Sequence, residues 1–357
     1  MLPSILHAYG LNAAQCKITP FGSGLINRTW KVEAPGGRDY ILQQINQDVF
    51  QQPDNIAVNI SSLAAYLRQH APGYLFPEPV ASLDGAGIVR DITGYFRLLP
   101  FIGPSKAYDV VTSPAMAYEA ARQFGRFTRL LEGFPYQQLR TTLAGFHDLS
   151  LRYTQFQSVL REGDLSRIAA AHDSIALVQQ FRDIETTYRH IRQDPQFKLR
   201  VTHHDTKISN VLFDEEGQGL CVIDLDTVMP GYFISDLGDM LRTYLSPVTE
   251  EEEDFSKINI RDAYFSAIIA GYLSEMKDSL TAAELQHLVY AGKFMIYMQA
   301  LRFLTDHLNN DRYYGARYGG HNLVRANNQL VLLQQLTAKE DAFKEIIQQA
   351  LKTPLRK

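Results

Sequence analysis

The sequence predicts an α+β protein, with a small β-rich N-terminal lobe followed by a larger helical C-terminal lobe. Up to about residue 102, short runs of alternating polar and apolar residues are separated by turn signals. From residue 103 onward, apolar residues recur mainly at the spacing of helices. One β-rich island, residues 201–228, interrupts the helical part. We therefore expect two domains, residues 1–102 and residues 103–357, with a boundary near residues 101–105.

The N-terminal lobe is expected to hold an antiparallel sheet and one helix. Residues 29–33 (T-W-K-V-E) and 39–45 (D-Y-I-L-Q-Q-I) have strand character, and A-P-G-G at 34–37 supplies the turn between them. Apolar residues at helical spacing predict a helix over residues 55–69. Further strands are expected at 80–83, 88–91 and 95–100.

Helix signals dominate the C-terminal lobe. Ser113 followed by Pro114 predicts a helix start, because serine can cap free N–H groups and proline is tolerated in the first turn. Thr281 and Glu284 have the spacing of a capping box, which predicts the start of another helix that runs through Leu304. Further helical segments are expected at 166–192, as one long helix, and at 323–351, as one or two helices.

Composition and charge exclude several classes of protein. The chain has 357 residues and a formal charge of −4, which leaves no excess of cations for a phosphate backbone and argues against nucleic-acid binding. Two cysteines, Cys16 and Cys221, cannot form a disulfide framework and fit reduced thiols in a cytoplasmic protein. No signal peptide is expected at the N-terminus, which lacks a basic segment. The most apolar stretch, residues 264–273, is too short to span a membrane.

The β-rich island carries the residues with the clearest chemistry. His203, Asp205 and Asn210 are spaced as H-x-D-x-x-x-x-N, and Asp224 follows the apolar strand 220–223. Phosphoryl transfer needs a carboxylate that orients the attacking hydroxyl, together with oxygen ligands that hold Mg²⁺ against the phosphates. We therefore expect Asp205 to be the base, and Asn210 and Asp224 to be metal ligands.

Neighbouring residues of the island have several possible roles. Lys207 lies two residues after Asp205, where a lysine can touch the γ-phosphate or the acceptor, or can simply be solvated. Asp226 shares a face with Asp224 if the chain is extended, so it could take a second metal, bind an acceptor hydroxyl or fix the loop. We expect His203 to pack beneath the loop, and Asp236 to support the loop from the next helix.

A glycine-rich turn precedes the first two predicted strands. Gly22, Ser23 and Gly24 form a G-x-G turn in which backbone can approach phosphates closely, although a plain hairpin turn would need no ligand. Asn27 follows, and its amide could cap the turn or reach a phosphate. We expect this turn to bind the nucleotide.

Segments beyond the motif carry a wider resemblance. They are G-S-G-L-I-N-R-T-W (22–30), Y-I-L-Q-Q-I-N (40–46), T-H-H-D-T-K (202–207), V-I-D-L-D-T-V-M-P-G (222–231), D-L-G-D (236–239) and L-R-F-L-T-D-H-L (301–308). On these segments the chain resembles the phosphotransferase enzyme family of aminoglycoside and choline kinases, and most closely the N-acetylhexosamine 1-kinases. The resemblance implies a bilobal, protein-kinase-like fold. It also implies ATP and Mg²⁺ as cofactors, with an amino sugar phosphorylated at its anomeric hydroxyl.

The sequence departs from the protein-kinase pattern at one position. Protein kinases place a lysine on the strand after the glycine-rich turn, yet no lysine occurs between Lys31 and Lys106. Gln43 shares a strand face with Ile41, as that lysine would. We therefore expect Gln43 to act as a neutral donor over the phosphates, and the resembled sugar kinases share this substitution.

Acceptor recognition is expected from the C-terminal lobe. The resemblance implies that Arg302 and Tyr313 contact the sugar, while an ion pair between Arg302 and Asp306 is the structural alternative. The acidic run 250–254 fits a solvated loop or a helix start, or weakly a site for a cationic acceptor. Two other functions stay open: a kinase of an aminoglycoside or choline-like amine, and a nucleotide-binding pseudokinase, which the missing lysine favours.

Overall fold

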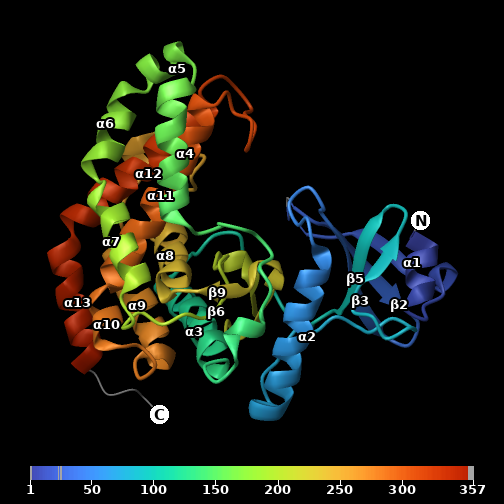
Figure 1. The fold of residues 1–357 in the computed structure, drawn as a ribbon. Coiled ribbons are helices and arrows are strands. Elements are labelled where there is room, and N and C mark those ends of the chain that lie inside the picture. Colours follow the sequence, from blue (N-terminus) through green and yellow to red (C-terminus); the bar gives the residue numbers. More distant parts are fainter. Residues whose placement is uncertain (1, 23, 25, 353–357) are drawn as a thin grey trace. The chain divides into compact units, whose positions relative to one another are not determined.

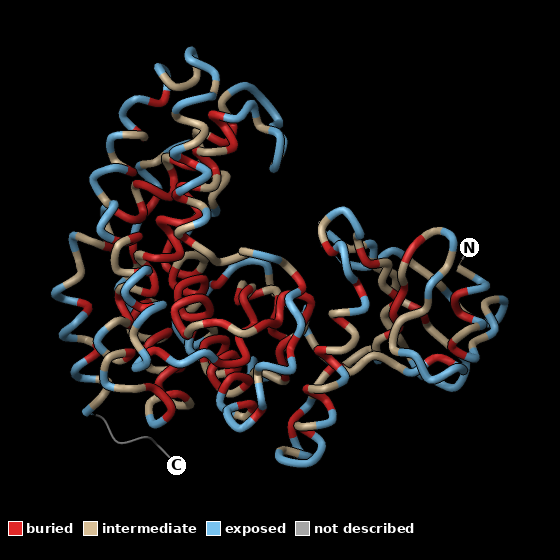
Figure 2. The backbone as a smooth tube through the Cα atoms, viewed as in Figure 1, coloured by how far each residue is buried: buried red, intermediate tan, exposed pale blue. Residues whose placement is uncertain are grey.

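The computed structural model describes residues 2–22, 24 and 26–352, which group into two compact units. The first unit comprises Met1–Ala107, Leu130–Ala144 and Asn210–Pro230, and the second comprises Tyr108–Arg129, Gly145–Ser209 and Gly231–Lys357. Figure 1 labels their helices and strands, and Figure 2 shows which residues are buried. The predicted division of functions between residues 1–102 and 103–357 stays a prediction.

An antiparallel five-stranded sheet forms most of the first unit. Its strands are arranged in the order β1-β2-β3-β5-β4. Thr29 of β2 lies opposite Gln43 of β3, and Gln43 lies opposite Arg97 of β5. The elements are α1 (Leu2–Ala8), β1 (Lys17–Pro20), β2 (Arg28–Ala34), β3 (Arg38–Ile45), α2 (Pro53–His70), β4 (Val89–Asp91) and β5 (Gly94–Pro100).

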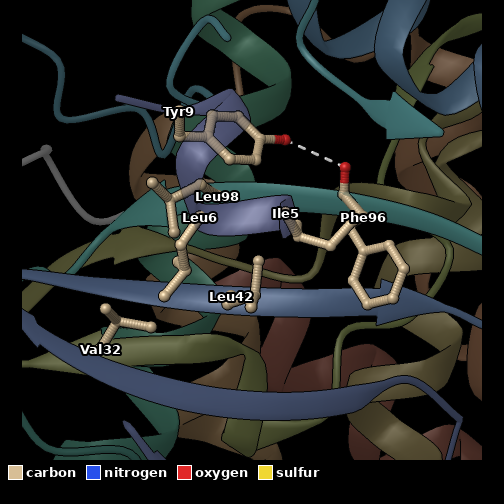
Figure 3. Close-up of a cluster of buried hydrophobic side chains, with 7 residues drawn as sticks. All are labelled: Ile5, Leu6, Tyr9, Val32, Leu42, Phe96 and Leu98. Carbon is tan, nitrogen blue, oxygen red and sulfur yellow. Dashed lines mark hydrogen bonds between the residues drawn. The ribbon is translucent and has the colours of Figure 1, made fainter. Parts of the chain in front are cut away.

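Apolar side chains of α1 cover one face of this sheet (Figure 3). Tyr9, just after α1, donates a hydrogen bond from its hydroxyl to the carbonyl oxygen of Phe96, at 3.0 Å. The cluster consists of Ile5, Leu6, Tyr9, Val32, Leu42, Phe96 and Leu98. Because successive side chains of a strand point to opposite faces, burying Leu42 leaves its neighbour Gln43 on the other face.

A short hairpin also belongs to the first unit. Strand β7 (Val211–Phe213) pairs with β8 (Gly219–Val222), with Val211 opposite Val222. Helix α2 is tied to the segment that follows, because Asn59 donates a 3.1 Å hydrogen bond to the carbonyl oxygen of Val228. The short 3-10 helix η4 (Leu225–Thr227) lies in this segment, and β9 (Met229–Gly231) follows it.

Helices make up most of the second unit. Nearly all residues of its longest helix, α11, are buried. Close approaches of other helices depend on glycine: a Cβ on Gly271 would lie 2.1 Å from the carbonyl oxygen of Tyr118, and one on Gly238 would lie 2.3 Å from that of Ala291. The elements are α3 (Pro114–Leu130), α4 (Leu149–Glu162), α5 (Leu165–Ala170), α6 (His172–Gln180), α7 (Asp183–Gln193), β6 (Arg200–Thr202), α8 (Phe233–Tyr244), α9 (Asp262–Met276), α10 (Ala282–Gln286), α11 (Leu288–Leu308), α12 (His321–Ala338) and α13 (Glu340–Lys352). Among the described helices, none has both the length and the apolar character needed to cross a membrane.

The predicted fold class is confirmed, as is the capping box of Thr281 and Glu284. Three predicted elements differ from the structure. The helix expected from Thr281 through Leu304 is two helices, α10 and α11. Residues 80–83 form no strand, because the chain turns back at once: the backbone N–H of Ser82 donates to the carbonyl oxygen of Ala86 at 2.8 Å. The single helix over 166–192 is three helices, α5, α6 and α7, although no glycine or proline marks the breaks.

Candidate active site

The segment after β6 is fixed by a carboxylate on α8. Asp236 accepts hydrogen bonds from the backbone N–H groups of His203, at 2.9 Å, and His204, at 2.7 Å. His203 is fully buried, and its ring lies 5.1 Å from that of Phe124, centroid to centroid. The expected packing role of His203 and the supporting role of Asp236 are therefore both seen in the structure. Asp205, which follows directly, is half-buried.

A second acidic residue of α8, Asp239, fixes the backbone on the C-terminal side of Asp205. The backbone N–H of Thr206 donates to Oδ2 of Asp239 at 2.8 Å, and the hydroxyl of Thr206 donates to the carbonyl oxygen of Asp236 at 2.8 Å. Arg242 pairs with Asp239 at 3.0 Å. The backbone on both sides of Asp205 is thus anchored to one helix, which limits where its carboxylate can lie.

Lysine and carboxylate meet directly in this segment. Nζ of Lys207 lies 2.9 Å from Oδ2 of Asp205, and both side chains retain access to solvent. An ammonium at this place can balance negative charge that arrives next to Asp205. Burial outweighs the two amide hydrogen bonds of Asp236 and raises the pKa of that carboxyl to about 7.

The two expected metal ligands lie at one end of the β7–β8 hairpin. Asn210 immediately precedes β7, and Asp224 follows β8 by two residues. The backbone N–H of Ile223 donates to the carbonyl oxygen of Asn210 at 2.9 Å, which holds the two ends together. Asp224 is exposed and has a left-handed backbone, with φ of 60°. The oxygens of a carboxylate and an amide suit Mg²⁺, which keeps several waters and needs few protein ligands.

The glycine-rich turn borders a cavity of about 460 Å³, whose lining includes Gly22, Gly24 and Asn27. Gly22 has a φ of 81°, which favours glycine. Ser23, also predicted to bind the nucleotide, lies outside the described residues. The side chain of Asn27 does not cap the turn, because both ends of its amide bind other residues. The amide nitrogen donates to Asp226 at 2.8 Å, and the amide oxygen accepts from the backbone N–H of Asn46 at 3.0 Å.

Gln43, which is expected to stand in for the missing lysine, has a cation beside it. Nε of Arg97 donates to Oε1 of Gln43 at 2.9 Å, and Nη1 of Arg97 pairs with Asp226. Lys31, on the neighbouring strand β2, instead forms an ion pair with Asp39 at 2.9 Å. Among the three roles left open for Asp226, the geometry matches fixing the loop, because both of its oxygens have protein partners.

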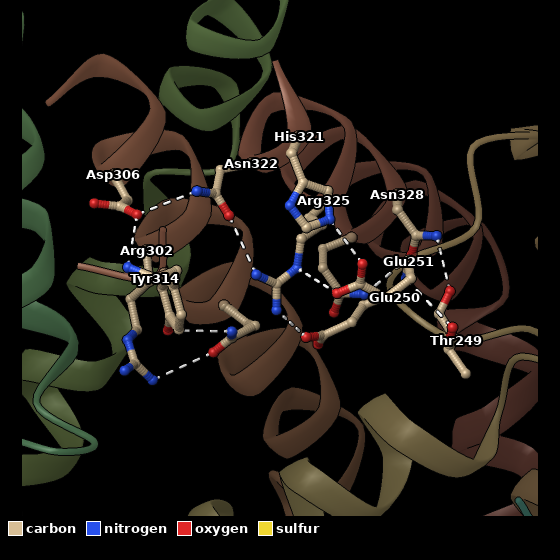
Figure 4. Close-up of polar contacts among 12 residues, drawn as sticks. Thr249, Glu250, Glu251, Arg302, Asp306, Tyr314, His321, Asn322, Arg325 and Asn328 are labelled. Carbon is tan, nitrogen blue, oxygen red and sulfur yellow. Dashed lines mark hydrogen bonds and ion pairs between the residues drawn. The ribbon is translucent and has the colours of Figure 1, made fainter. Parts of the chain in front are cut away.

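Arg302 and Tyr313 line one pocket of the second unit. The cavity measures about 350 Å³ and also includes Arg152, Asp306 and Tyr314 in its wall. Arg302 makes two long contacts, to Oε1 of Gln299 at 3.3 Å and to the hydroxyl of Tyr313 at 3.4 Å. Figure 4 shows Arg302 and Tyr314 on one side of the surrounding polar network.

The alternative ion pair between Arg302 and Asp306 is not formed. Asp306 instead accepts hydrogen bonds from the backbone N–H groups of Tyr313, at 2.8 Å, and Tyr314, at 2.9 Å. The buried Asn322 donates a third, at 3.1 Å. Asp306 therefore shapes the loop that presents both tyrosines.

Comparison with known proteins identifies the family of the chain. A sequence model described as the phosphotransferase enzyme family matches residues 17–276. The chain belongs to this family.

Solved structures of low identity share the fold of this phosphotransferase. An aminoglycoside phosphotransferase from Alicyclobacillus acidocaldarius is 12% identical with a TM-score of 0.66, the match covering 98% of this chain and 97% of that one. A microcompartment-associated aminopropanol kinase is 17% identical with a TM-score of 0.65, covering 96% and 98%. An amicoumacin kinase solved with AMP-PNP, Ca²⁺ and its ligand is 16% identical with a TM-score of 0.62, covering 94% and 92%.

Sequence reasoning missed two arginines of this phosphotransferase. Arg97 lies in the apolar strand segment Y-F-R-L-L. A single charge in such a segment indicates a buried partner of opposite charge, but no neighbouring residue in the sequence identifies that partner. Arg152 lies on α4, a helix that the sequence analysis did not predict.

The acidic run of this phosphotransferase is a loop in which Glu253 and Asp254 are exposed and Asp254 caps a short 3-10 helix, whereas its first two carboxylates are engaged. Glu250 pairs with Arg242 at 2.8 Å. Glu250 also pairs with Arg325, and Glu251 lies 2.7 Å from Nε2 of His321 (Figure 4). These carboxylates are therefore engaged by cations of the same unit, which leaves them poorly placed to bind a cationic acceptor.

Proposed function

We propose that the chain is a kinase that transfers the γ-phosphate of ATP to the anomeric hydroxyl of an N-acetylhexosamine. The observation that carries the proposal is the anchored segment around Asp205. Asp236 and Asp239 fix its backbone, and Lys207 lies beside its carboxylate. A fixed carboxylate next to a cation is what a phosphoryl-transfer site needs to orient a hydroxyl and to balance charge.

Each residue of the motif has a proposed task. Asp205 orients the acceptor hydroxyl and takes its proton, and Lys207 touches the γ-phosphate or the acceptor. Asn210 and Asp224 would hold Mg²⁺, which when bound supplies positive charge for the phosphates. Because an anomeric hydroxyl is more acidic than an ordinary alcohol, positioning is the larger part of the work of Asp205.

The nucleotide is assigned to residues of the first unit. The turn at Gly22 and Gly24 borders a cavity, and the amide of Gln43 lies on the sheet face opposite the apolar cluster. The adenine is proposed to bind backbone groups near residues 100–103. The amicoumacin kinase of the same fold was solved with AMP-PNP and Ca²⁺, which supports a nucleotide together with a divalent metal.

The charge of the acceptor pocket favours a hydroxyl-rich acceptor over a cationic one. Arg152 and Arg302 both line it, and each lowers the affinity of the pocket for a cation. The one carboxylate in its wall, Asp306, is occupied by backbone amides. Arginine, tyrosine and asparagine side chains can instead pair with hydroxyl and acyl oxygens. The segments 222–231 and 301–308, which resemble N-acetylhexosamine 1-kinases, support the same acceptor.

The test is acceptor-dependent release of ADP from MgATP. N-acetylhexosamines, unmodified hexoses, an aminoglycoside and choline are compared, and ³¹P NMR locates the phosphate on the product. We expect turnover with an N-acetylhexosamine and a sugar 1-phosphate product. Turnover confined to cationic acceptors would refute the sugar assignment, and nucleotide binding without turnover on any acceptor would favour a pseudokinase.

A matched pair of variants tests the role of Asp205. Asp205→Asn removes the carboxylate and should abolish most turnover while nucleotide affinity stays nearly unchanged. Glu216→Gln, at an exposed position on the β7–β8 turn, should leave both quantities at the parental level. Substantial activity in Asp205→Asn would contradict the assignment.

A further inference from the structure

A buried ion pair lies next to Gln43 in the first unit. Arg97 and Asp226 retain only 2% and 1% of their side-chain exposure. They are 129 positions apart in the sequence. Arg97 lies on β5 directly opposite Gln43 of β3, and Asp226 lies two residues after Asp224.

Arg97 determines how the amide of Gln43 is oriented. A guanidinium has donors and no acceptor, so the amide oxygen of Gln43 must face Nε of Arg97. The amide nitrogen is thereby turned the other way, where Thr29 on β2 accepts from it at 3.3 Å. Without Arg97, nothing on β5 would distinguish the two ends of this amide.

Asp226 connects Arg97 to the residue that follows the glycine-rich turn, Asn27. Oδ2 of Asp226 accepts from the amide nitrogen of Asn27 at 2.8 Å, while Oδ1 pairs with Arg97. Asn27 in turn accepts from the backbone N–H of Asn46, just after β3. One ion pair therefore connects the end of the turn, two strands of the sheet and the segment that carries Asp224.

We propose that Arg97 is the positioning residue that takes over from the missing lysine. Paired with Asp226, it aims the Gln43 amide and holds the glycine-rich turn to the metal-binding segment. Asp226 is then an anchor for Arg97 and Asn27, and the metal is left to Asn210 and Asp224. The inference rests on the proposed use of a nucleotide, so binding of MgATP to the parent protein is measured first; its absence would defeat the proposed function itself.

The first experiment separates nucleotide binding from acceptor binding. Arg97→Met should raise the KM for ATP about tenfold or more, with the acceptor KM within about twofold of the parent. Arg97→Lys keeps the charge but loses the two-donor fork, so it should raise the KM for ATP about threefold. Thermal unfolding of each variant confirms that the protein measured is folded. A folded Arg97→Met or Arg97→Lys protein with the parental KM for ATP would overturn the proposal.

A rescue variant distinguishes positioning from general stability. Gln43→Lys in the Arg97→Met background returns a cation to the other member of the same cross-strand pair, close to Asp226. We expect it to recover about threefold or more of the lost ATP affinity. No recovery in a folded double variant would contradict the inference, because a purely structural loss is not repaired by moving the charge.

The metal requirement tests the role of Asp226. Asp224→Asn should raise the concentration of Mn²⁺ needed for half-maximal activity about tenfold or more. Asp226→Asn should raise the KM for ATP and leave that Mn²⁺ concentration within about twofold of the parent. An equal rise in both variants would show that Asp226 is a metal ligand and would overturn its assignment as an anchor.

Discussion

The backbone N–H of His204 donates a 2.7 Å hydrogen bond to Asp236, and it does so from a left-handed backbone with φ of 67°. Few residues other than glycine adopt this conformation without a compensating contact. The second oxygen of Asp236 holds the preceding amide, that of His203. One buried carboxylate therefore maintains the backbone that delivers Asp205.

Replacing this carboxylate by an amide should destabilise the protein. In Asp236→Asn, the new NH₂ group must face one of the two backbone N–H groups, which leaves a buried donor without an acceptor. We expect the free energy of unfolding to fall by about 1–3 kcal/mol, measured by urea titration. Asp278→Asn, at an exposed position, is the control and should change little. Equal stability of the two variants would contradict the supporting role of Asp236.

The same residue predicts a pH dependence of stability. Burial raises the pKa of Asp236 to about 7, whereas aspartate in an unfolded chain titrates near pH ~3.9. The folded state thus holds this proton more tightly. Its contribution to stability is complete below pH ~3.9 and is lost as the pH rises to about 7, by at most about 1.4 kcal/mol per pH unit.

Comparing the parent with Asp236→Asn isolates that contribution. The variant cannot titrate at this position, so the difference in unfolding free energy between the two proteins should decrease between pH 5 and pH 8. A difference that does not vary with pH would mean that the carboxyl of Asp236 is ionised over the whole range.

A buried ion pair at the start of β6 should be important for stability. Arg200 binds Glu284 through two contacts, at 2.6 and 2.7 Å, and the Glu284 side chain is fully buried. Glu284→Gln leaves the guanidinium without its charge partner and should cost about 3–5 kcal/mol of unfolding free energy. Glu345→Gln, at an exposed position on α13, should cost little. A loss of less than about 1 kcal/mol would show that the pair is replaceable.

The local parts of the site could be predicted from the sequence, and the long-range parts could not. The spacing of Asp205, Asn210 and Asp224 predicts a phosphoryl-transfer segment, because these residues lie on one short strand–loop–strand stretch. The partner of Arg97 was not predictable, since Asp226 lies 129 positions away and pairs with it only through the fold. Local spacing also allowed an ion pair that does not form. Asp306 lies one helical turn from Arg302, but its carboxylate binds the backbone amides of Tyr313 and Tyr314 instead.

Gly231 provides a test of packing under the catalytic segment. A Cβ at this position would lie 2.6 Å from Nε2 of His204 and 2.9 Å from the hydroxyl oxygen of Thr202. Gly231→Ala should therefore displace His204, lowering kcat and costing about 1–3 kcal/mol of stability. Gly73→Ala, where a Cβ would meet nothing within 4 Å, is the matched control. Parental kcat and stability in Gly231→Ala would show that the His204 ring can move without consequence.

The final prediction concerns the acceptor pocket. The guanidinium of Arg302 lies 5.4 Å from the ring centroid of Tyr314 and 5.6 Å from that of Phe146, so aromatic faces hold it while its hydrogen bonds stay long. Such a group can turn its donors toward a ligand at little cost. Arg302→Ala should raise the acceptor KM about tenfold or more, with the KM for ATP unchanged.

Two further variants are compared with Arg302→Ala: one should have a smaller effect on the acceptor KM, and the other is a control. Tyr313 is exposed, and it contacts Arg302 through its hydroxyl at 3.4 Å and through its ring, whose centroid lies 5.8 Å from the guanidinium. Tyr313→Phe removes the hydroxyl contact and keeps the ring, so it should raise the acceptor KM about threefold. Arg312→Ala removes an exposed arginine of the same loop that does not line the cavity, and it should leave both KM values unchanged. If Arg302→Ala altered the KM for ATP and left that of the acceptor at the parental value, this pocket would not be the acceptor site.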